Sequence, residues 1–347
     1  MKRAQRHGGD AISVAKNGRG RSGRLGVMAV TAVSAMALLG ANSAQASTVT
    51  VGSVLPTTFK SEPFTQAQTL FNTVLPEAGA NLASPVDGAI VRWRVQGAKG
   101  GPFLLRVLRP NGKGAYSAQG TSDPATPTGL GLQTFSTNIP VEAGDLIGID
   151  SSAPTDEIGF ATVAGATYAS MFPPPLEGAT QPPSATKSGM EIELSAEVQP
   201  VPTINSVSPR SGSIAGNTTV TIKGHDFNGA SGVKFGTKPA ASFTVNSETE
   251  ITATSPRSLQ PGRFEVNVAT VAGESSGSGS GHFTYTACVV PKLKGKTLAV
   301  SKRKLKNAGC KLGKVSGTKS KTAKVITQKP KPGKVILPGS KVSVKVG

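Results

Sequence analysis

The sequence predicts a mainly β protein with two β-sandwich domains followed by a small α+β domain. Gly and Pro are frequent, at 42 and 25 of 347 residues, which favours short elements joined by turns. Val, Thr and Ser dominate the apolar runs, as is typical of strands. Apolar and polar residues alternate in segments such as 89–95 and 103–109, with the period of two that a half-buried strand requires.

The first 46 residues have the pattern of a secretory signal peptide. Basic residues precede the apolar run 25–41, and Ala44-Gln45-Ala46 closes it with small residues. The alternative is a membrane anchor, but a run of about 17 residues is shorter than the roughly 20 that a spanning helix needs. We therefore expect cleavage after Ala46, export by the Sec route and no transmembrane segment in the mature chain.

Charge is distributed very unevenly along the mature chain. Residues 47–286 carry fourteen Lys and Arg against eighteen Asp and Glu, whereas residues 287–347 carry seventeen Lys and Arg and no acid. A mildly acidic arm therefore precedes a strongly basic C-terminal region, and that asymmetry bears on the protein's partners.

Residues 47–200 are predicted to form the first sandwich. Trp93, the only tryptophan, shares a strand face with Val91 and Val95 by the period of two, so we assign it to the core. The turn and strand at 141–150 resemble strand edges in jelly-roll domains. A Pro-rich surface loop at 172–183 and a stiff linker at 199–202 are expected to follow.

Four carboxylates of this region are candidates for chemistry. They lack the alternating spacing of a calcium loop, so solvated turn residues are the favoured interpretation. One alternative is a cell-wall hydrolase, in which two of the four carboxylates would act as acid and base across a groove. Another alternative is a carbohydrate-binding domain, which would have an aromatic or polar patch on one exposed sheet face. The four residues are Asp145, Asp150, Asp156 and Glu157.

Residues 202–286 resemble the IPT/TIG family of immunoglobulin-like domains. The resemblance implies a spacer or protein-contact module without catalytic machinery. Val220 and Ile222 alternate with Thr, as a sandwich strand requires. The segments that carry the resemblance are 202–209, 216–224, 233–236, 251–256 and 266–268.

Residues 287–347 resemble a PASTA domain. Thr297 can cap a helix on which Leu298, Leu305 and Ala308 share one face, and Gly309 can end it. Ser301 and Lys304 depart from the family pattern, because small apolar residues usually stand there and face the sheet. The segments that carry the resemblance are 290–298, 308–310, 313–315, 325–333 and 339–346.

Cys288 and Cys310 are the only cysteines of the chain, and an exported protein meets an oxidising compartment. We therefore expect them to form a disulfide. The alternative is two buried thiols, and the mature chain has too few further Cys and His residues for a zinc site.

The resemblance to PASTA domains implies binding of peptidoglycan or its stem peptides, and the unopposed positive charge should attract anionic wall polymers. Another surface protein stays open as a partner. Nucleic acid is disfavoured, because residues 287–347 contain no aromatic side chain on which bases could stack. The candidate wall-binding residues are Lys302, Arg303, Lys306, Lys311, Lys314, Lys329, Lys331 and Lys334.

The mature chain shows no motif of an enzyme, such as a nucleophile elbow, a phosphate-binding loop or an HExxH pair. We expect no catalytic residue, no cofactor and no bound metal. The sequence as a whole predicts a secreted, cell-wall-associated binding or scaffold protein.

Overall fold

The computed structural model describes residues 47–275, 279–318 and 320–347. The predicted signal peptide at residues 1–46 lies outside the described residues. The architecture is mainly β, as the sequence predicts, and no helix of the described residues is long and apolar enough to cross a membrane.

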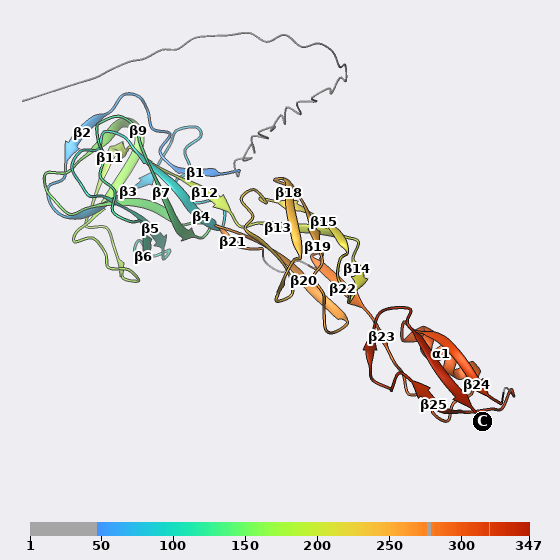
Figure 1. Ribbon diagram of the computed structural model, residues 1–347. Helices are drawn as coiled ribbons and strands as arrows, with labels where there is room; N and C mark the ends of the chain where they lie inside the picture. The colour runs from blue at the N-terminus through green and yellow to red at the C-terminus, as the bar shows by residue number, and fades with distance from the viewer. Residues whose placement is uncertain (1–46, 276–278, 319) are drawn as a thin grey trace, which may run out of the picture. The chain divides into compact units, whose positions relative to one another are not determined.

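Residues 49–200 form two antiparallel sheets (Figure 1). One sheet has four strands in the order β1-β12-β4-β7; the other has the order β10-β6-β5-β8-β3-β9-β11, with β2 also paired to β9. The strands are β1 Val49–Gly52, β2 Lys60–Pro63, β3 Gln68–Val74, β4 Gly88–Val95, β5 Leu104–Pro110, β6 Tyr116–Thr121, β7 Gln133–Val141, β8 Leu146–Ser151, β9 Glu157–Met171, β10 Thr180–Gln181, β11 Ala185–Ile192 and β12 Leu194–Pro200. Because β12 continues to Pro200, the predicted linker at 199–202 is wrong in its first half.

The core of this first sandwich contains Trp93, which is completely buried, as expected. The prediction that Val91 shares the buried face of the strand with Trp93 is wrong, however. The pairing of β4 with β7 shifts between Ile90 and Arg92, so a β-bulge interrupts the alternation. Ile90 therefore lies in the core with Trp93 and Val95, and Val91 is only partly buried.

Residues 203–286 form a second sandwich with its own core. Val220 and Ile222 are completely buried in it, as their alternation with Thr predicts. One sheet has the order β13-β15-β19-β18; the other has β14-β22-β20-β16-β17, with β21 beside β20. The strands are β13 Thr203–Ser208, β14 Ser211–Ser213, β15 Thr219–His225, β16 Gly232–Phe235, β17 Lys238–Pro239, β18 Ser242–Ser247, β19 Glu250–Thr254, β20 Gly262–Thr270, β21 Gly273–Glu274 and β22 His282–Thr286.

Residues 288–347 form the small α+β domain, in which helix α1 packs against β24 (Figure 1). The central strand β27 pairs with β24 in parallel and with β25 antiparallel. A separate two-stranded sheet joins β23 to β26. The elements are β23 Cys288–Val289, α1 Leu298–Asn307, β24 Lys311–Gly317, β25 Val325–Lys329, β26 Val335–Ile336 and β27 Lys341–Val346.

The helix follows the predicted pattern closely. Thr297 occupies the position before the first turn, although its side chain makes no capping hydrogen bond. Leu305 is completely buried, and Leu298 and Ala308 pack against the same core. Gly309 ends the helix with φ +68°, where a Cβ would lie 2.7 Å from the carbonyl oxygen of Ala287.

Ser301 and Lys304 of α1 are the two residues that depart from the family pattern. Ser301 is completely buried on the face toward the sheet, as the resemblance predicts for this position. Lys304 is exposed, so its predicted place against the sheet is wrong. At about 100° per residue, Lys304 points about 100° away from the buried Leu305 and about 60° from Ser301, which places it at the edge of the buried face.

Cys288 and Cys310 form a disulfide, as the sequence predicts. The bridge joins the first strand of this domain, β23, to the segment directly after α1. Both cysteines belong to the core of the domain, together with Leu305 and the inward-facing valines of β27. The disulfide therefore fixes the two ends of the chain segment that contains the helix.

Candidate binding surfaces of the C-terminal domain

The sheet β24-β27-β25 has one face toward the helix and one toward solvent. Val342, Val344 and Val346 are buried on the helix side. Because side chains alternate along a strand, Lys341, Ser343 and Lys345 of β27 point to the other side. We call this solvent side the outer sheet face.

A β-bulge on β24 adds a lysine to the outer sheet face. Leu312 pairs with Val342 and Val315 pairs with Val344, so β24 contains one extra residue between these pairs. Both Leu312 and Val315 consequently pack on the helix side, and Lys314 is exposed. The backbone N–H of Lys314 donates a 3.2 Å hydrogen bond to the Ser343 hydroxyl, which holds the bulge against β27.

Three lysines line one hollow of about 320 Å³ on the outer sheet face: Lys314, Lys329 and Lys345. Lys345 lies between Ser316 of β24 and Thr327 of β25 in the strand register. Ser343 lies opposite Lys329. We call Lys314, Lys329 and Lys345 the outer-face lysines.

The floor of this hollow is held in place by Gln328. Its amide nitrogen donates a 2.9 Å hydrogen bond to the carbonyl oxygen of Pro291, and its amide oxygen accepts a 2.7 Å bond from the N–H of Leu293. The side chain of Gln328 therefore links β25 to the segment before α1 and is not available to a ligand. Lysine ammonium groups with Ser and Thr hydroxyls between them remain to bind a ligand, and that combination suits carboxylate or phosphate oxygens.

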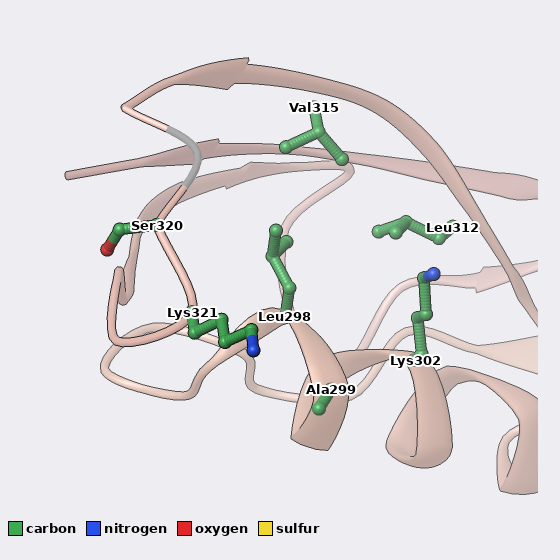
Figure 2. A pocket seen from close by; sticks show the side chains of 7 residues that line it. All are labelled: Leu298, Ala299, Lys302, Leu312, Val315, Ser320 and Lys321. Carbon is green, nitrogen blue, oxygen red and sulfur yellow. The ribbon is translucent and has the colours of Figure 1, made fainter.

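A second surface lies between α1 and β24. Figure 2 shows Leu298, Ala299 and Lys302 on the helix and Leu312 and Val315 on the strand opposite. Lys321 approaches from the segment that follows β24, and the cleft has a volume of about 730 Å³. Its wall is aliphatic and its two nearby charges are positive, so it suits a small aliphatic group that carries an anion.

All eight residues predicted to bind the wall are exposed. The structure distributes them over several elements and brings only some of them into a shared hollow. Lys314 and Lys329 meet on the outer sheet face, and Lys302 lines the cleft beside α1. Arg303 and Lys306 lie on the helix, Lys311 begins β24, and Lys331 and Lys334 lie between β25 and β26.

Two lysines of these surfaces are absent from the sequence-based set. Lys345 completes the outer-face hollow, and Lys321 completes the helix-side cleft. The alternation Lys341-Val-Ser-Val-Lys345 already places Lys345 on the side away from the valines, so periodicity could have found it. Lys321 lies in an irregular segment for which the sequence gives no comparable signal.

The four carboxylates of the first sandwich do not form a site together. Asp145 is bound by Arg109 at 2.7 and 2.9 Å, and Asp150 by the buried Arg106 at 2.8 Å. The described residues contain no cluster of acids, His or Cys suited to a metal ion. Asp156 accepts hydrogen bonds from Ser151 and from the N–H of Gly101, and Glu157 lies 3.5 Å from Lys99. Their interpretation as solvated turn residues is wrong for Asp145, Asp150 and Asp156, which are buried.

A different carboxylate pair has raised pKa values. Burial raises the pKa of Glu191 to about 7 and that of Glu193 to about 8, and the neighbouring Glu77 adds to both shifts. Neither Glu191 nor Glu193 has any exposed surface, so a substrate cannot reach either of them in this conformation. The sequence segment Glu191-Ile-Glu193 alternates like an ordinary strand, which conceals that its polar side faces the interior.

Comparison with known domain families decides what the second and third parts of the chain are. The family description "IPT/TIG domain" matches residues 202–285, and "PASTA domain" matches residues 289–347. The chain contains an IPT/TIG domain and a PASTA domain. The two surfaces described above thus belong to the PASTA domain. Both domains are non-catalytic binding modules, and their combination fits a cell-envelope binding or scaffold role.

Comparisons over longer stretches add little. No curated protein matches the chain. Two structures of the full extracellular region of plexin A4 align with 65% and 58% of it at 12% identity, with TM-scores of 0.23 and 0.22. The chain spans 34% and 28% of those two plexin chains.

Proposed function

We propose that the protein is secreted and held at the cell envelope by its PASTA domain, which binds peptidoglycan or an anionic wall polymer. The observation that carries this proposal is the outer sheet face, where Lys314, Lys329 and Lys345 line one hollow in a domain without acids. No carboxylate of the domain's own side chains competes for these ammonium groups. Their positive charge is therefore free to meet an external anion.

The physical basis of retention is ionic. Wall polymers repeat phosphate or carboxylate groups, and a basic sheet face can contact several of them at once. Such binding gains from the release of counterions and weakens steeply as salt rises. The cleft between α1 and β24 complements this face, because a stem peptide of peptidoglycan combines small aliphatic side chains with a carboxylate.

Export and the role of the other domains belong to the same proposal. The pattern of residues 1–46 supports secretion, and a disulfide between Cys288 and Cys310 fits an oxidising compartment. The two β-sandwiches act as spacer and interaction modules. We assign no catalysis to the chain, because Asp145 and Asp150 are each engaged by an arginine.

Co-sedimentation of the purified full-length chain with insoluble peptidoglycan, with and without its anionic polymers, tests the proposal. We expect the wild-type chain to sediment with the wall. A variant with Lys314→Ala, Lys329→Ala and Lys345→Ala should stay largely in solution. Repeating the assay without the polymers tells whether peptidoglycan or the polymer is the ligand.

A matched control separates the hollow from net charge. Lys292, Lys294 and Lys296 are exposed in the same domain and do not line the outer-face hollow, so their triple replacement by Ala removes the same charge. It should weaken sedimentation much less. If both triple variants lose the same amount of sedimentation, the binding depends on net charge alone and not on the hollow. If the wild-type chain does not sediment, wall binding is refuted.

A further inference from the structure

The first sandwich contains a small hollow that neither the wall-binding proposal nor the domain families explain. It has a volume of about 250 Å³ and lies between β2, β3, β9 and β11. Apolar clefts for drug-sized ligands typically measure about 300–1,000 Å³, so this hollow has room for one small ring.

Strand pairing places the side chains of the hollow on one face of the larger sheet. Lys187 of β11 lies opposite Tyr168 of β9, and Ser170 lies opposite Leu70 of β3. Tyr168 and Ser170 are two residues apart, and so are Gln68 and Leu70, so all five side chains share that face.

The floor of the hollow is apolar and includes an aromatic pair. Leu70, Ile158 and Phe160 are buried in the core of the sandwich and line the hollow from below. The ring of the half-buried Tyr168 packs on Phe160, with ring centres 5.0 Å apart and planes inclined by 47°. An apolar floor that includes a tyrosine offers a surface on which a sugar ring can pack.

Polar groups surround this floor without partners of their own. Gln68 and Ser170 are each only 8% exposed and line the hollow, yet within the described residues neither side chain makes a hydrogen bond. Because both residues line the hollow, their amide and hydroxyl groups are available to hydrogen-bond a ligand there. The carboxylate of Glu62 and the ammonium of Lys187 complete the rim, and neither forms an ion pair among the described residues.

The balance of these groups identifies the ligand chemistry. Tyr168, Lys187 and the Gln68 amide can donate hydrogen bonds, and Glu62, Ser170 and the Gln68 carbonyl can accept them. Burial and the nearby Glu62 raise the pKa of Tyr168, so its hydroxyl keeps its proton. One positive and one negative side chain leave the rim without net charge. A neutral ligand with several hydroxyl groups and one apolar face matches this lining.

We propose that this hollow binds one pyranose ring of a neutral saccharide, packed on Tyr168 and hydrogen-bonded by Gln68 and Ser170. The first sandwich would thereby be a carbohydrate-binding module, independent of the ionic wall binding of the PASTA domain. A carbohydrate-binding domain was one alternative that the sequence allowed for residues 47–200, and the hollow names the residues that would bind the sugar.

The test measures binding of the purified full-length chain to an array of neutral saccharides that end in glucose, galactose, mannose or N-acetylglucosamine. We expect at least one of these saccharides to bind. Tyr168→Ala removes the packing surface and Gln68→Leu removes the buried amide at nearly constant volume. Each should weaken that binding by about tenfold or more, as the loss of one good contact does.

Two controls make every outcome decisive. Phe172→Ala removes an exposed aromatic of the same domain, 45% exposed and outside the hollow, and should leave binding unchanged. The triple variant of the outer-face lysines should also bind the saccharide normally. The proposal is overturned if no saccharide of the array binds, or if binding survives both Tyr168→Ala and Gln68→Leu in variants that are folded.

Discussion

The hydroxyl group of Ser53 donates a 2.5 Å hydrogen bond to one carboxylate oxygen of Glu191 inside the first sandwich. Glu191 and the nearby Glu193 are both buried. Among the described residues, the other oxygen of Glu191 and both oxygens of Glu193 have no hydrogen-bond partner. Burial therefore raises the pKa of Glu191 to about 7 and of Glu193 to about 8.

These raised pKa values predict that the first sandwich loses stability as the pH rises. In the unfolded chain both carboxyls release their protons near the ordinary glutamate pKa of 4.5, whereas in the folded chain the pKa is about 7 for Glu191 and about 8 for Glu193. Between these limits the folded state binds more protons, so the free energy of unfolding falls with increasing pH. Glu193→Gln should remove much of this fall.

Trp93 gives the measurement, because it is the only tryptophan and lies in the core of this sandwich. Thermal unfolding followed by its fluorescence should show a higher Tm for Glu193→Gln than for wild type at about pH 8, and a much smaller difference at about pH 5. Parallel Tm curves for the two proteins across this range would contradict the buried-pair account.

Asp150 is predicted to be structural. Its partner Arg106 is itself buried, with a side chain only 9% exposed, so Asp150→Asn leaves a buried guanidinium without its counter-charge. Breaking such a pair costs about 3–5 kcal/mol of unfolding free energy. Urea unfolding followed by Trp93 fluorescence measures that loss.

Glu157→Gln is the matched control for Asp150→Asn, since Glu157 faces the largely exposed Lys99. Exposed pairs contribute about 0–1 kcal/mol, so this variant should unfold almost like wild type. If the two variants lose equal stability, the buried ion pair does not have the role assigned to it.

Ser301→Ala should stabilise the PASTA domain. The Ser301 hydroxyl is completely buried between α1 and the sheet, and within the described residues it has no hydrogen-bond partner. Its removal relieves an unsatisfied polar group and improves helix propensity, together about 1 kcal/mol or more. Hydrogen exchange of the β27 amides reports the change, and Ser316→Ala on the exposed outer face should alter it little. Faster exchange in Ser301→Ala would show that the hydroxyl has a partner.

The disulfide should contribute roughly 3 kcal/mol to the stability of the PASTA domain, because it closes a loop over 22 positions around α1. Replacing Cys288 and Cys310 together by Ala should accelerate exchange of the buried Val342 and Val344 amides by a corresponding factor. The two sandwiches should keep their exchange rates, since they contain no cysteine. Unchanged exchange in the PASTA domain would mean that its core suffices without the bridge.

Local patterns in the sequence predicted the elements that depend on local physics. The face shared by Leu298, Leu305 and Ala308 and the termination at Gly309 follow from helical geometry alone. Trp93 was correctly placed in the core, but its neighbour Val91 was not. A β-bulge depends on the partner strands, which the sequence of β4 by itself does not specify.

The candidate sites show the same limit. Lys314 and Lys329 were identified as basic residues, but their meeting with Lys345 depends on the register of three strands and on the bulge in β24. The apparent surface acids Asp145 and Asp150 proved to be partners of Arg109 and Arg106, which lie on a different strand, β5. Long-range pairing of this kind has no signature in the local sequence.

The central claim is that the outer-face lysines hold the protein on the wall, and a salt series tests it most directly. The measurement is the affinity of the full-length chain for insoluble peptidoglycan that carries its anionic polymers. We predict that the logarithm of affinity falls linearly with the logarithm of salt concentration. The slope should become shallower in the Lys314, Lys329 and Lys345 triple alanine variant than in the Lys292, Lys294 and Lys296 variant. Affinity that does not change with salt, or equal slopes for both variants, would contradict the account.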